Sequence, residues 1–516
     1  MATPNEKIAE SLIKLKELQD SKIVAIKASD LTRVHKERLL KNGFIKEVVR
    51  GWYISVPHDE VIGISTSWFT SFWEFCSRYL KDRYGEDYCV SAEQSLAFHA
   101  ANTTVPKQLI IRSIKGNNLP TELLFGTSIF VMKSSPPSQA ELEEINGIKG
   151  MNLPSSIIYS TPSVFKNQAI DMRTALFRIR DASDLLGILL DGGHSKLAGR
   201  LSGAFRNIGR HKIADEIIKA MKSADYDVRE IDPFDAKSPV SFKLRETSPY
   251  VNRIKLMWHE MREKVISVFP KPPGIPKDIK KYLEQVDEIY VTDAYHSLSI
   301  ERYKVTPDLI EKVRSGEWNT EDNEEDRKQK DAMAARGYWL AFNEVKKSIE
   351  RIFKLENSGR VTDEEHGAWY RQLFAPSVAV GLLKPSDLAG YRTAQVYISQ
   401  SMHTPVRRDA VRDTMPALFA LLEQEEHPGV RAVLGHFVFV YIHPYMDGNG
   451  RIARFLMNSM LISGGYPWTV IPVEQRDQYM KALESASVAQ DILPFAEYIA
   501  YLVTEGLKGK PVAKVK

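Results

Sequence analysis

The chain has 516 residues, of which 43% are hydrophobic and 26% are charged, and its formal net charge is +4. This length is enough for about two to four domains, and the small charge does not indicate a polyanion partner for the whole chain. Two cysteines, Cys76 and Cys89, are too few for a disulfide framework or a cysteine metal site. The start of the chain is polar, unlike a signal peptide, and no apolar run approaches the ~20 residues of a membrane span. We therefore expect a cytoplasmic protein without a membrane segment.

The first 60 residues show the order helix, turn and basic hairpin. Residues 31–41 form an amphipathic pattern ended by Asn-Gly, and 46–54 read as two short strands. Between 31 and 50 there are six Lys or Arg against two Glu. We interpret 1–60 as a winged helix-turn-helix that contacts DNA through 29–54, with Arg33, Lys36 and Arg50 as the candidate DNA-binding residues. A winged fold used for protein contacts, or a charged solvated face, explains the pattern equally well.

Residues 61–230 mix helical and strand patterns, and we predict an α+β regulatory region. An aromatic stripe from Trp68 to Tyr79 is typical of a core helix. Strands are expected at 88–90, 108–114 and 128–133, and helices over 163–225. A second basic cluster could be another nucleic-acid surface, although a solvated helix face is favoured; its members are Arg200, Arg206, Arg210, His211 and Lys212.

A change of composition separates this region from the rest of the chain. Residues 231–279 contain the densest proline run, at 269–276, which is typical of a stiff connector. Residues 280–508 are predicted to be almost entirely helical, interrupted by one β-hairpin at 393–405. The expected fold class is therefore multi-domain, with an N-terminal α+β region and a C-terminal all-α domain that carries a single hairpin.

The polar stretch from His443 to Arg454 lies between two apolar helical patterns, so we expect a loop between two buried helices. Glycines at the start of a helix let backbone N–H groups converge on an anion. Two arginines three apart suit a di- or triphosphate. A nearby carboxylate suits Mg²⁺, and a histidine suits a general base. The candidate residues are His443 as base, Asp447 for magnesium, and Asp447, Gly448, Asn449, Gly450, Arg451 and Arg454 for phosphate.

Other interpretations of this loop are weaker. Zinc usually needs at least three protein ligands, and His443 and Asp447 provide two. A Gly-x4-Gly-Lys-Ser/Thr phosphate loop is absent from the sequence. A plain helix-loop-helix turn with a buried histidine would not require glycines, arginines, a carboxylate and a histidine together in one short stretch.

The stretch from His443 to Arg454 resembles the signature of the Fic family, His-Pro-Phe-x-Asp/Glu-Gly-Asn-Gly-Arg-x-x-Arg, with Tyr445 in place of phenylalanine. Residues 390–406 resemble the flap hairpin of that family, and 476–483 resemble the segment whose tyrosine, here Tyr479, lies near the adenine. Before these, the winged pattern and residues 90–99 resemble the N-terminal regulator module of abortive-infection antitoxins. The Fic resemblance covers roughly 280–505 and implies an all-α Fic domain with a flap.

The resemblance implies a protein adenylyltransferase. ATP would bind over 448–451 with Mg²⁺ held by Asp447, and a target protein would dock along 393–405. His443 would deprotonate a target hydroxyl, which attacks the α-phosphorus. Gly450 favours nucleotidyl transfer, because a kinase-like branch of the family has lysine at that position. Transfer of UMP or phosphocholine stays open.

The resemblance also implies an inhibitory helix. Ser297 and Glu301 lie one helical turn apart, as in the family pattern Ser/Thr-x-x-x-Glu-Gly/Asn. Glu301 would pair with Arg454 and exclude the γ-phosphate. Arg302 departs from the small or amide residue of the pattern, and its effect on the fit of the helix stays open.

Two classes of function therefore remain. One is an AMP transferase restrained by Glu301, acting on a target and on itself. The other is a DNA-binding regulator, of the toxin–antitoxin kind, whose Fic domain serves as a nucleotide sensor. Removal of AMP from a modified target is a further alternative, and a homo-oligomer is left open.

Overall fold

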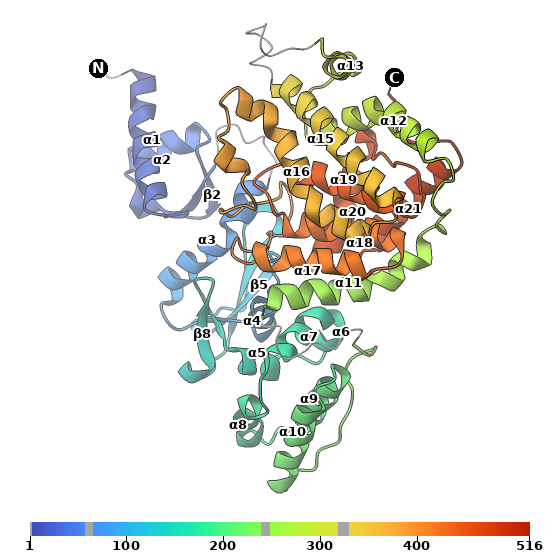
Figure 1. The fold of residues 1–516 in the computed structure, drawn as a ribbon. Coiled ribbons are helices and arrows are strands. Elements are labelled where there is room, and N and C mark those ends of the chain that lie inside the picture. Colours follow the sequence, from blue (N-terminus) through green and yellow to red (C-terminus); the bar gives the residue numbers. More distant parts are fainter. Residues whose placement is uncertain (1–2, 57–64, 239–247, 318–329, 516) are drawn as a thin grey trace. The chain divides into compact units, whose positions relative to one another are not determined.

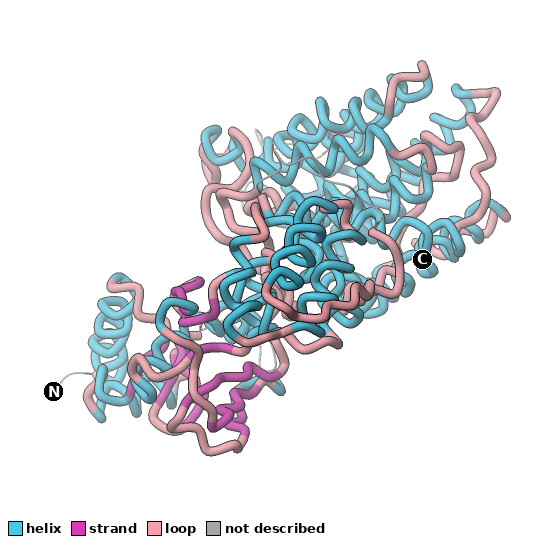
Figure 2. Tube along the Cα trace, turned by 90° about the horizontal axis from the view of Figure 1, so that it is seen from below, coloured by secondary structure: helices cyan, strands magenta, loops and turns pink. Residues whose placement is uncertain are grey.

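The computed structural model describes residues 3–56, 65–238, 248–317 and 330–515, and the chain divides into two compact units (Figure 1). Unit 1 comprises Met1–Pro249 and Tyr397–Thr404, and unit 2 comprises Tyr250–Val396 and Pro405–Lys516. All strands of the described residues belong to unit 1, and unit 2 consists of helices and loops (Figure 2). The predicted contrast between an α+β N-terminal region and a helical C-terminal region is present.

Unit 1 begins with a small helix-and-sheet module. Its elements are α1 (Pro4–Asp20), β1 (Ala25–Lys27), α2 (Arg33–Lys41), β2 (Ile45–Val49) and β3 (Trp52–Ser55). The strand order is β1-β3-β2, with both pairs antiparallel. Thr32 caps α2 by accepting the backbone N–H of His35 at 3.3 Å. Gly51 has φ +82°, which allows the tight turn between β2 and β3. The helix and the two strands predicted here are therefore formed.

Residues 65–238, the rest of the described part of unit 1, contain a four-stranded sheet, a two-stranded sheet and eight α-helices. The elements are α3 (Thr66–Tyr84), β4 (Cys89–Val90), α4 (Ala92–His99), β5 (Gln108–Ser113), β6 (Pro120–Glu122), β7 (Ser128–Lys133), β8 (Leu142–Ile145), β9 (Ile148–Met151), α5 (Leu153–Tyr159), α6 (Val164–Asn167), α7 (Ala169–Arg178), α8 (Ser183–Asp191), α9 (Ser195–Asn207) and α10 (His211–Ser223). The sheet order is β4-β5-β7-β6, and β8 pairs with β9. Trp68, Phe72 and Phe75 are fully buried in one core with Leu109 and Ile129, so the predicted role of the aromatic stripe is confirmed.

Unit 2 is a helical domain. Its helices are α11 (Pro249–Val268), α12 (Ile279–Ile300), α13 (Pro307–Ser315), α15 (Lys330–Phe353), α16 (Ser358–Ala379), α17 (Val411–Gln424), α18 (Pro428–Ile442), α19 (Asn449–Ile462), α20 (Arg476–Val488) and α21 (Leu493–Leu507). Helices α18 and α19 pack on each other, α16 packs on α19 (Figure 1), and nearly every residue of α18 and α19 is buried. Helix α16 lies within the range predicted to be helical, although the sequence analysis did not give its bounds, and it contains Gly359, Gly367 and Pro376, which normally argue against a helix.

The predicted connector at 231–279 differs from the structure. Helix α11 lies inside this range, and from Tyr250 onward it belongs to unit 2. Arg253 donates from Nε to the hydroxyl of Tyr441 on α18 at 3.0 Å, and Arg262 pairs with Glu425 at 2.8 Å. The proline-dense part, 269–276, is without helix or strand, as the sequence predicted. The helix was missed because prolines lie on both sides of it, at 233, 239 and 270–276, and prolines normally indicate loops.

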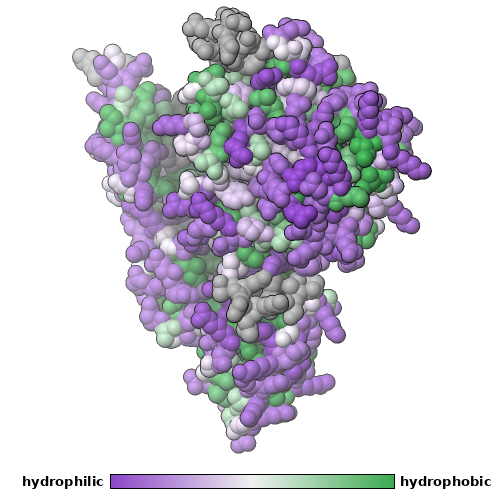
Figure 3. All heavy atoms as spheres, in the orientation of Figure 1, coloured by the Kyte–Doolittle hydropathy of each residue, from purple (hydrophilic) through white to green (hydrophobic). Residues whose placement is uncertain are grey.

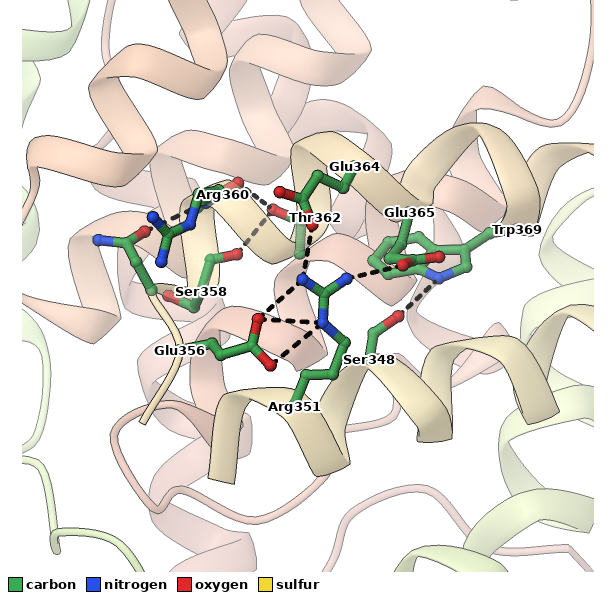
Figure 4. A network of polar contacts seen from close by, with 11 residues as sticks. Ser348, Arg351, Glu356, Ser358, Arg360, Thr362, Glu364, Glu365 and Trp369 are labelled. Carbon is green, nitrogen blue, oxygen red and sulfur yellow. Dashed lines mark hydrogen bonds and ion pairs between the residues drawn. The ribbon is translucent and has the colours of Figure 1, made fainter. Parts of the chain in front are cut away.

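A charged network joins α15 to α16 (Figure 4). The guanidinium of Arg351 contacts three carboxylates, with distances of 2.8 Å to Glu356, 2.6 Å to Glu364 and 2.7 Å to Glu365. These contacts raise the pKa of Arg351, first through the hydrogen bond that Arg351 donates to Glu356. The network holds the turn between two long helices that both pack on α19.

Hydrophilic side chains cover most of the face seen in Figure 3. Over the ranges that the structure describes, we found no helix with the length and apolarity needed to cross a bilayer.

Candidate active site

The loop between α18 and α19 has a fixed, unusual backbone. His443 ends α18 with φ +54°, and Gly448 precedes α19 with φ +80°. Asn449 closes the loop, because its side-chain oxygen accepts the N–H of Tyr445 and its amide donates to the carbonyl of Tyr445, both at 2.9 Å. The predicted boundaries of both helices are confirmed. Asn449 therefore shapes the loop, and its side-chain amide is used for that purpose.

His443 is arranged to accept a proton. Its Nδ1 lies 3.2 Å from the carbonyl of Val440, so Nδ1 carries the hydrogen and Nε2 keeps a lone pair. Burial lowers the pKa of His443 to about 4. The imidazole is thus neutral at neutral pH, which is the form that a general base requires.

Arg451 is held in a buried sandwich on the first turn of α19. Its guanidinium carbon lies 5.2 Å from the ring centre of Tyr303 and 5.1 Å from that of Phe374. The side chain is 1% exposed, and its Nη2 lies 3.5 Å from the carboxylate of Asp447, which is 66% exposed. Stacking on two aromatic faces fixes the plane of the guanidinium. The sequence did not identify Tyr303 or Phe374.

Arg454 is bound to the end of α12. Its Nε donates to the hydroxyl of Ser297 at 2.8 Å, and its Nη2 donates to the carbonyl of Ser297 at 3.0 Å and to Glu301 Oε1 at 2.8 Å. Burial acts to raise the pKa of Glu301, but the charges of Arg454 and Arg451 outweigh it and lower that pKa. The predicted pairing of Glu301 with Arg454 is present in the structure, and the two contacts of Ser297 with Arg454 were not predicted.

Glu301 also lies against the N-terminus of α19. A methyl group on Gly450 would come within 2.3 Å of Glu301 Oε1, so the carboxylate touches the backbone at the start of that helix. Unpaired N–H groups at a helix N-terminus attract anions. A carboxylate of the chain therefore occupies the position where the sequence predicted phosphate oxygens.

Arg302 lies just after the end of α12 and has a left-handed conformation, with φ +67°. The N–H of Tyr303 donates to the carbonyl of Leu298 at 3.1 Å, and the N–H of Arg302 donates to that of Ser299 at 2.9 Å. This is the pattern of a helix end that normally uses glycine or asparagine. Arg302 therefore does not prevent the geometry of the inhibitory pattern, although its side chain makes that geometry less favourable.

Arg392 holds the backbone of the loop by hydrogen bonds, a role that the sequence analysis did not identify. Its Nε donates to the carbonyl of His443 at 2.8 Å, its backbone N–H donates to that of Pro444 at 2.9 Å, and its Nη1 donates to that of Ala394 at 3.0 Å. The side chain is 4% exposed. A cation at the C-terminus of α18 satisfies the carbonyls that the helix leaves unpaired.

The β-hairpin predicted at 393–405 is wrong. Across the described parts of the chain, this segment takes part in one β-bridge, which joins Thr104 to His403 within unit 1. Carbonyls that a hairpin ladder would use accept side-chain donors instead: Ala394 accepts from Arg392, and Pro405 accepts from Gln395 at 3.0 Å. Pro405 itself has no N–H to contribute to a ladder.

A cavity of about 760 Å³ opens beside the loop within unit 2. Its lining includes Asp447, Arg451, Tyr303, Phe374, Lys330 and Arg412. This volume falls in the range of small-molecule sites, and the cationic and aromatic side chains suit an anionic ligand with a flat ring.

Tyr479 lies on α20 and is 1% exposed. Its hydroxyl lies 2.9 Å from Nε2 of His436, and burial raises the pKa of Tyr479 to about 12. The hydroxyl is therefore neutral and fixed by a buried partner. A contact between Tyr479 and adenine stays a prediction.

No cluster of three or more metal-ligating side chains occurs in the ranges covered by the structure. Asp447 is the one exposed carboxylate of the loop, and it accepts the N–H of Gly448 at 2.5 Å. A single carboxylate fits Mg²⁺, which binds one or two carboxylates together with phosphate oxygens and water.

The basic residues of unit 1 differ in their exposure to solvent and in whether they form ion pairs. Arg33 is 87% exposed but pairs with Glu37 at 2.8 Å, Lys36 is half-buried, and Arg50 is exposed. In the second basic cluster, Arg206 pairs with Glu230 at 2.6 Å and Asp215 at 2.7 Å, and Arg210 donates to backbone carbonyls. Arg206 thus joins α9 to Asp215 on α10 and to Glu230, and a solvated helix face stays a prediction.

Comparisons with known proteins point to one family. Residues 361–461 match the model of the Fic/DOC family. A protein adenylyltransferase Fic of Nematostella vectensis is 27% identical over 252 residues, which cover 48% of this chain and 55% of that protein. Protein adenylyltransferase fic-1 of Caenorhabditis elegans is 34% identical over 125 residues, covering 23% of this chain and 24% of the other. The corresponding protein of Drosophila grimshawi is 38% identical over 125 residues, covering 23% and 25%.

The chain thus spans about half the length of the first of these relatives and about a quarter of the other two. Among solved structures, Fic-1 (residues 134–508) of C. elegans is similar with a TM-score of 0.37 at 18% identity, covering 66% of this chain and 97% of that one. A Fic domain containing signaling protein of Bacteroides thetaiotaomicron has a TM-score of 0.34 at 19% identity, covering 50% of this chain and 99% of that one.

Proposed function

We propose that this chain is a Fic-type protein adenylyltransferase, which transfers AMP from ATP to a hydroxyl group of a target protein. The observation that carries the proposal is the position of Glu301. A carboxylate of the chain is bound by Arg454 at 2.8 Å and touches the N-terminus of α19 at Gly450. The same groups, the guanidinium of Arg454 and the N-terminus of α19, can bind phosphate once the carboxylate of Glu301 has moved away.

The residues of the loop divide the chemistry among them. The phosphates of ATP bind to Arg451, Arg454 and the start of α19. Nε2 of His443 accepts the proton of the target hydroxyl, whose oxygen attacks the α-phosphorus in line. The bond from the α-phosphorus to the bridging oxygen breaks, and pyrophosphate leaves. Asp447 would hold Mg²⁺, which supplies positive charge to the phosphates when bound.

Glu301 acts as a brake in this proposal. Glu301 and Ser297 take the Nε and Nη2 hydrogens of Arg454, so only Nη1 is left, and a two-pronged contact with a γ-phosphate requires Glu301 to leave. Binding of ATP in the productive position therefore requires the end of α12 to move or Glu301 to be replaced.

Labelled ATP tests the proposal. Glu301→Gly is expected to increase auto-modification when the label is on the α-phosphate, and His443→Ala in the same background is expected to abolish it. ATP labelled on the γ-phosphate is the matched control and should leave no label, because pyrophosphate leaves. Transfer of the γ-label, or equal α-labelling by the His443→Ala variant, would contradict AMP transfer by this loop.

The N-terminal module supports a second candidate function, sequence-specific DNA binding through a winged helix. Its element order and its strand order β1-β3-β2 support this proposal, together with the exposed Arg33 and Arg50. Arg33→Ala and Arg50→Ala should each weaken binding to the promoter of its own operon and reduce its salt dependence. A gel shift with no complex at low salt would exclude this function.

A further inference from the structure

Eight residues of the flap-like segment belong to the N-terminal unit. Tyr397–Thr404 are part of unit 1, whereas the residues on either side, Val396 and Pro405, are part of unit 2. The segment contacts residues of unit 1 that lie far before it in the chain. Thr66, for example, is hydrogen-bonded to Ser399, which lies 333 positions later. The flap is therefore not a free loop of the catalytic unit.

Backbone pairing holds this segment. The N–H of Val105 donates to the carbonyl of Met402 at 2.8 Å, and Thr104 and His403 form an antiparallel β-bridge. Pro106 follows Val105 and keeps it extended. Residues 102–105 thus lie beside 402–403 as one strand lies beside another.

Side chains strengthen the attachment. His403 is 1% exposed, and Met402 packs against the core that contains Val105 and Phe72. The hydroxyl of Thr66 accepts the N–H of Gln400 at 3.4 Å and donates to the hydroxyl of Ser399 at 3.3 Å. Buried side chains on both sides of the backbone pairing make it a specific contact.

We propose that residues 102–105 occupy the backbone edge of the flap to which an extended segment of a target protein pairs, so that unit 1 must release this edge before a target docks. This proposal rests on the proposed function. Strand addition gains its affinity from main-chain hydrogen bonds, and the carbonyl of Met402 is already used. The occupant carries Thr103 and Thr104, which have the hydroxyl chemistry of an acceptor.

The competition favours the chain's own segment. An occupant joined covalently to the flap has an effective concentration on the order of millimolar. A target that pairs only through its backbone is displaced by such an occupant.

A reversible cross-link tests the proposal. Directly opposed residues of an antiparallel pair have Cα atoms about 4.5–5.5 Å apart, which is within the range of a disulfide. Thr104→Cys together with His403→Cys is therefore expected to form a disulfide on oxidation, seen as a mobility shift on a non-reducing gel. The natural Cys76 and Cys89 are buried and do not compete.

Activity of the cross-linked protein is measured in the Glu301→Gly background with α-labelled ATP and a soluble cell extract as the acceptor. Oxidation should lower transfer to extract proteins at least about tenfold, and reduction should restore it. The two single-cysteine variants are the controls and should not respond. A disulfide that forms without changing transfer would overturn the proposal. If the reduced protein transfers no label at all, the proposed function fails instead, while the gel still reports the contact.

Hydrogen exchange tests the contact without relying on folding of the double variant. In the otherwise natural chain, Thr66→Ala should speed amide exchange of 397–404 about fivefold, as expected for one or two hydrogen bonds. Thr66→Ser keeps the hydroxyl and should exchange like the natural chain. Exchange of 397–404 at the rate of an unstructured peptide in the natural chain would overturn the proposal.

Discussion

Substitution of Arg302 by glycine should strengthen the inhibition exerted by Glu301. Arg302 lies directly after Glu301, the residue that caps α12, and its backbone is in the left-handed region with φ +67°. A side chain in this region costs about 1–2 kcal/mol relative to glycine, and the extra freedom of glycine in an open state offsets about 0.5–1 kcal/mol of that gain. Arg302→Gly should therefore stabilise the closed helix end by about 1 kcal/mol.

This free energy corresponds to about a fivefold lower population of the open, ATP-competent state. The assay is the initial rate of auto-modification with α-labelled ATP, and Arg302→Gly is expected to lower it about fivefold. Arg302→Ala is the matched control, because it removes the charge and keeps the Cβ atom, and it should change the rate less than about twofold.

The Glu301→Gly background separates strain from other effects. Once the carboxylate is gone, Arg454 has lost its contact at 2.8 Å, and Arg302→Gly should no longer change the rate. An equal reduction by Arg302→Gly and Arg302→Ala, or a reduction that persists in the Glu301→Gly background, would refute the reasoning from backbone strain.

Three further outcomes follow from contacts within unit 2. Tyr303→Leu removes one face of the sandwich around Arg451 and should weaken Mg-ATP binding about fivefold in calorimetry, whereas Tyr303→Phe keeps the ring and should bind normally. Arg351→Ala leaves three carboxylates without their partner and should lower the free energy of unfolding by about 1–2 kcal/mol in denaturant titration, with Arg351→Lys in between. Burial lowers the pKa of His366 to about 4 and that of His436 to about 3, from 6.5. The unfolded state therefore binds more protons below pH 6.5, and unfolding free energy should fall by about 1.4 kcal/mol per pH unit for each histidine as the pH decreases. A melting temperature that stays constant down to about pH 5 would contradict this assignment.

The catalytic loop could be predicted from the sequence because its information is local. His443 to Arg454 are nearly contiguous, and apolar residues on both sides determine two buried helices whose ends meet at the loop. The conformations of Gly448 and the first turn of α19 follow from the same few residues. The pairing of Glu301 with Arg454 was expected from a resemblance, since no periodicity relates residues 153 positions apart.

Tertiary structure decided which distant groups complete the site. Tyr303 and Phe374 reach Arg451 from two different segments, and Arg392 reaches the end of α18 from a third. The alternating pattern at 393–399 indicated a hairpin, yet its carbonyls found side-chain partners and its tip paired with residues of unit 1. A local sequence pattern indicates which backbone groups need hydrogen-bond partners. Which partners they obtain depends on the packing of segments far apart in the chain, and a sequence pattern does not contain that information.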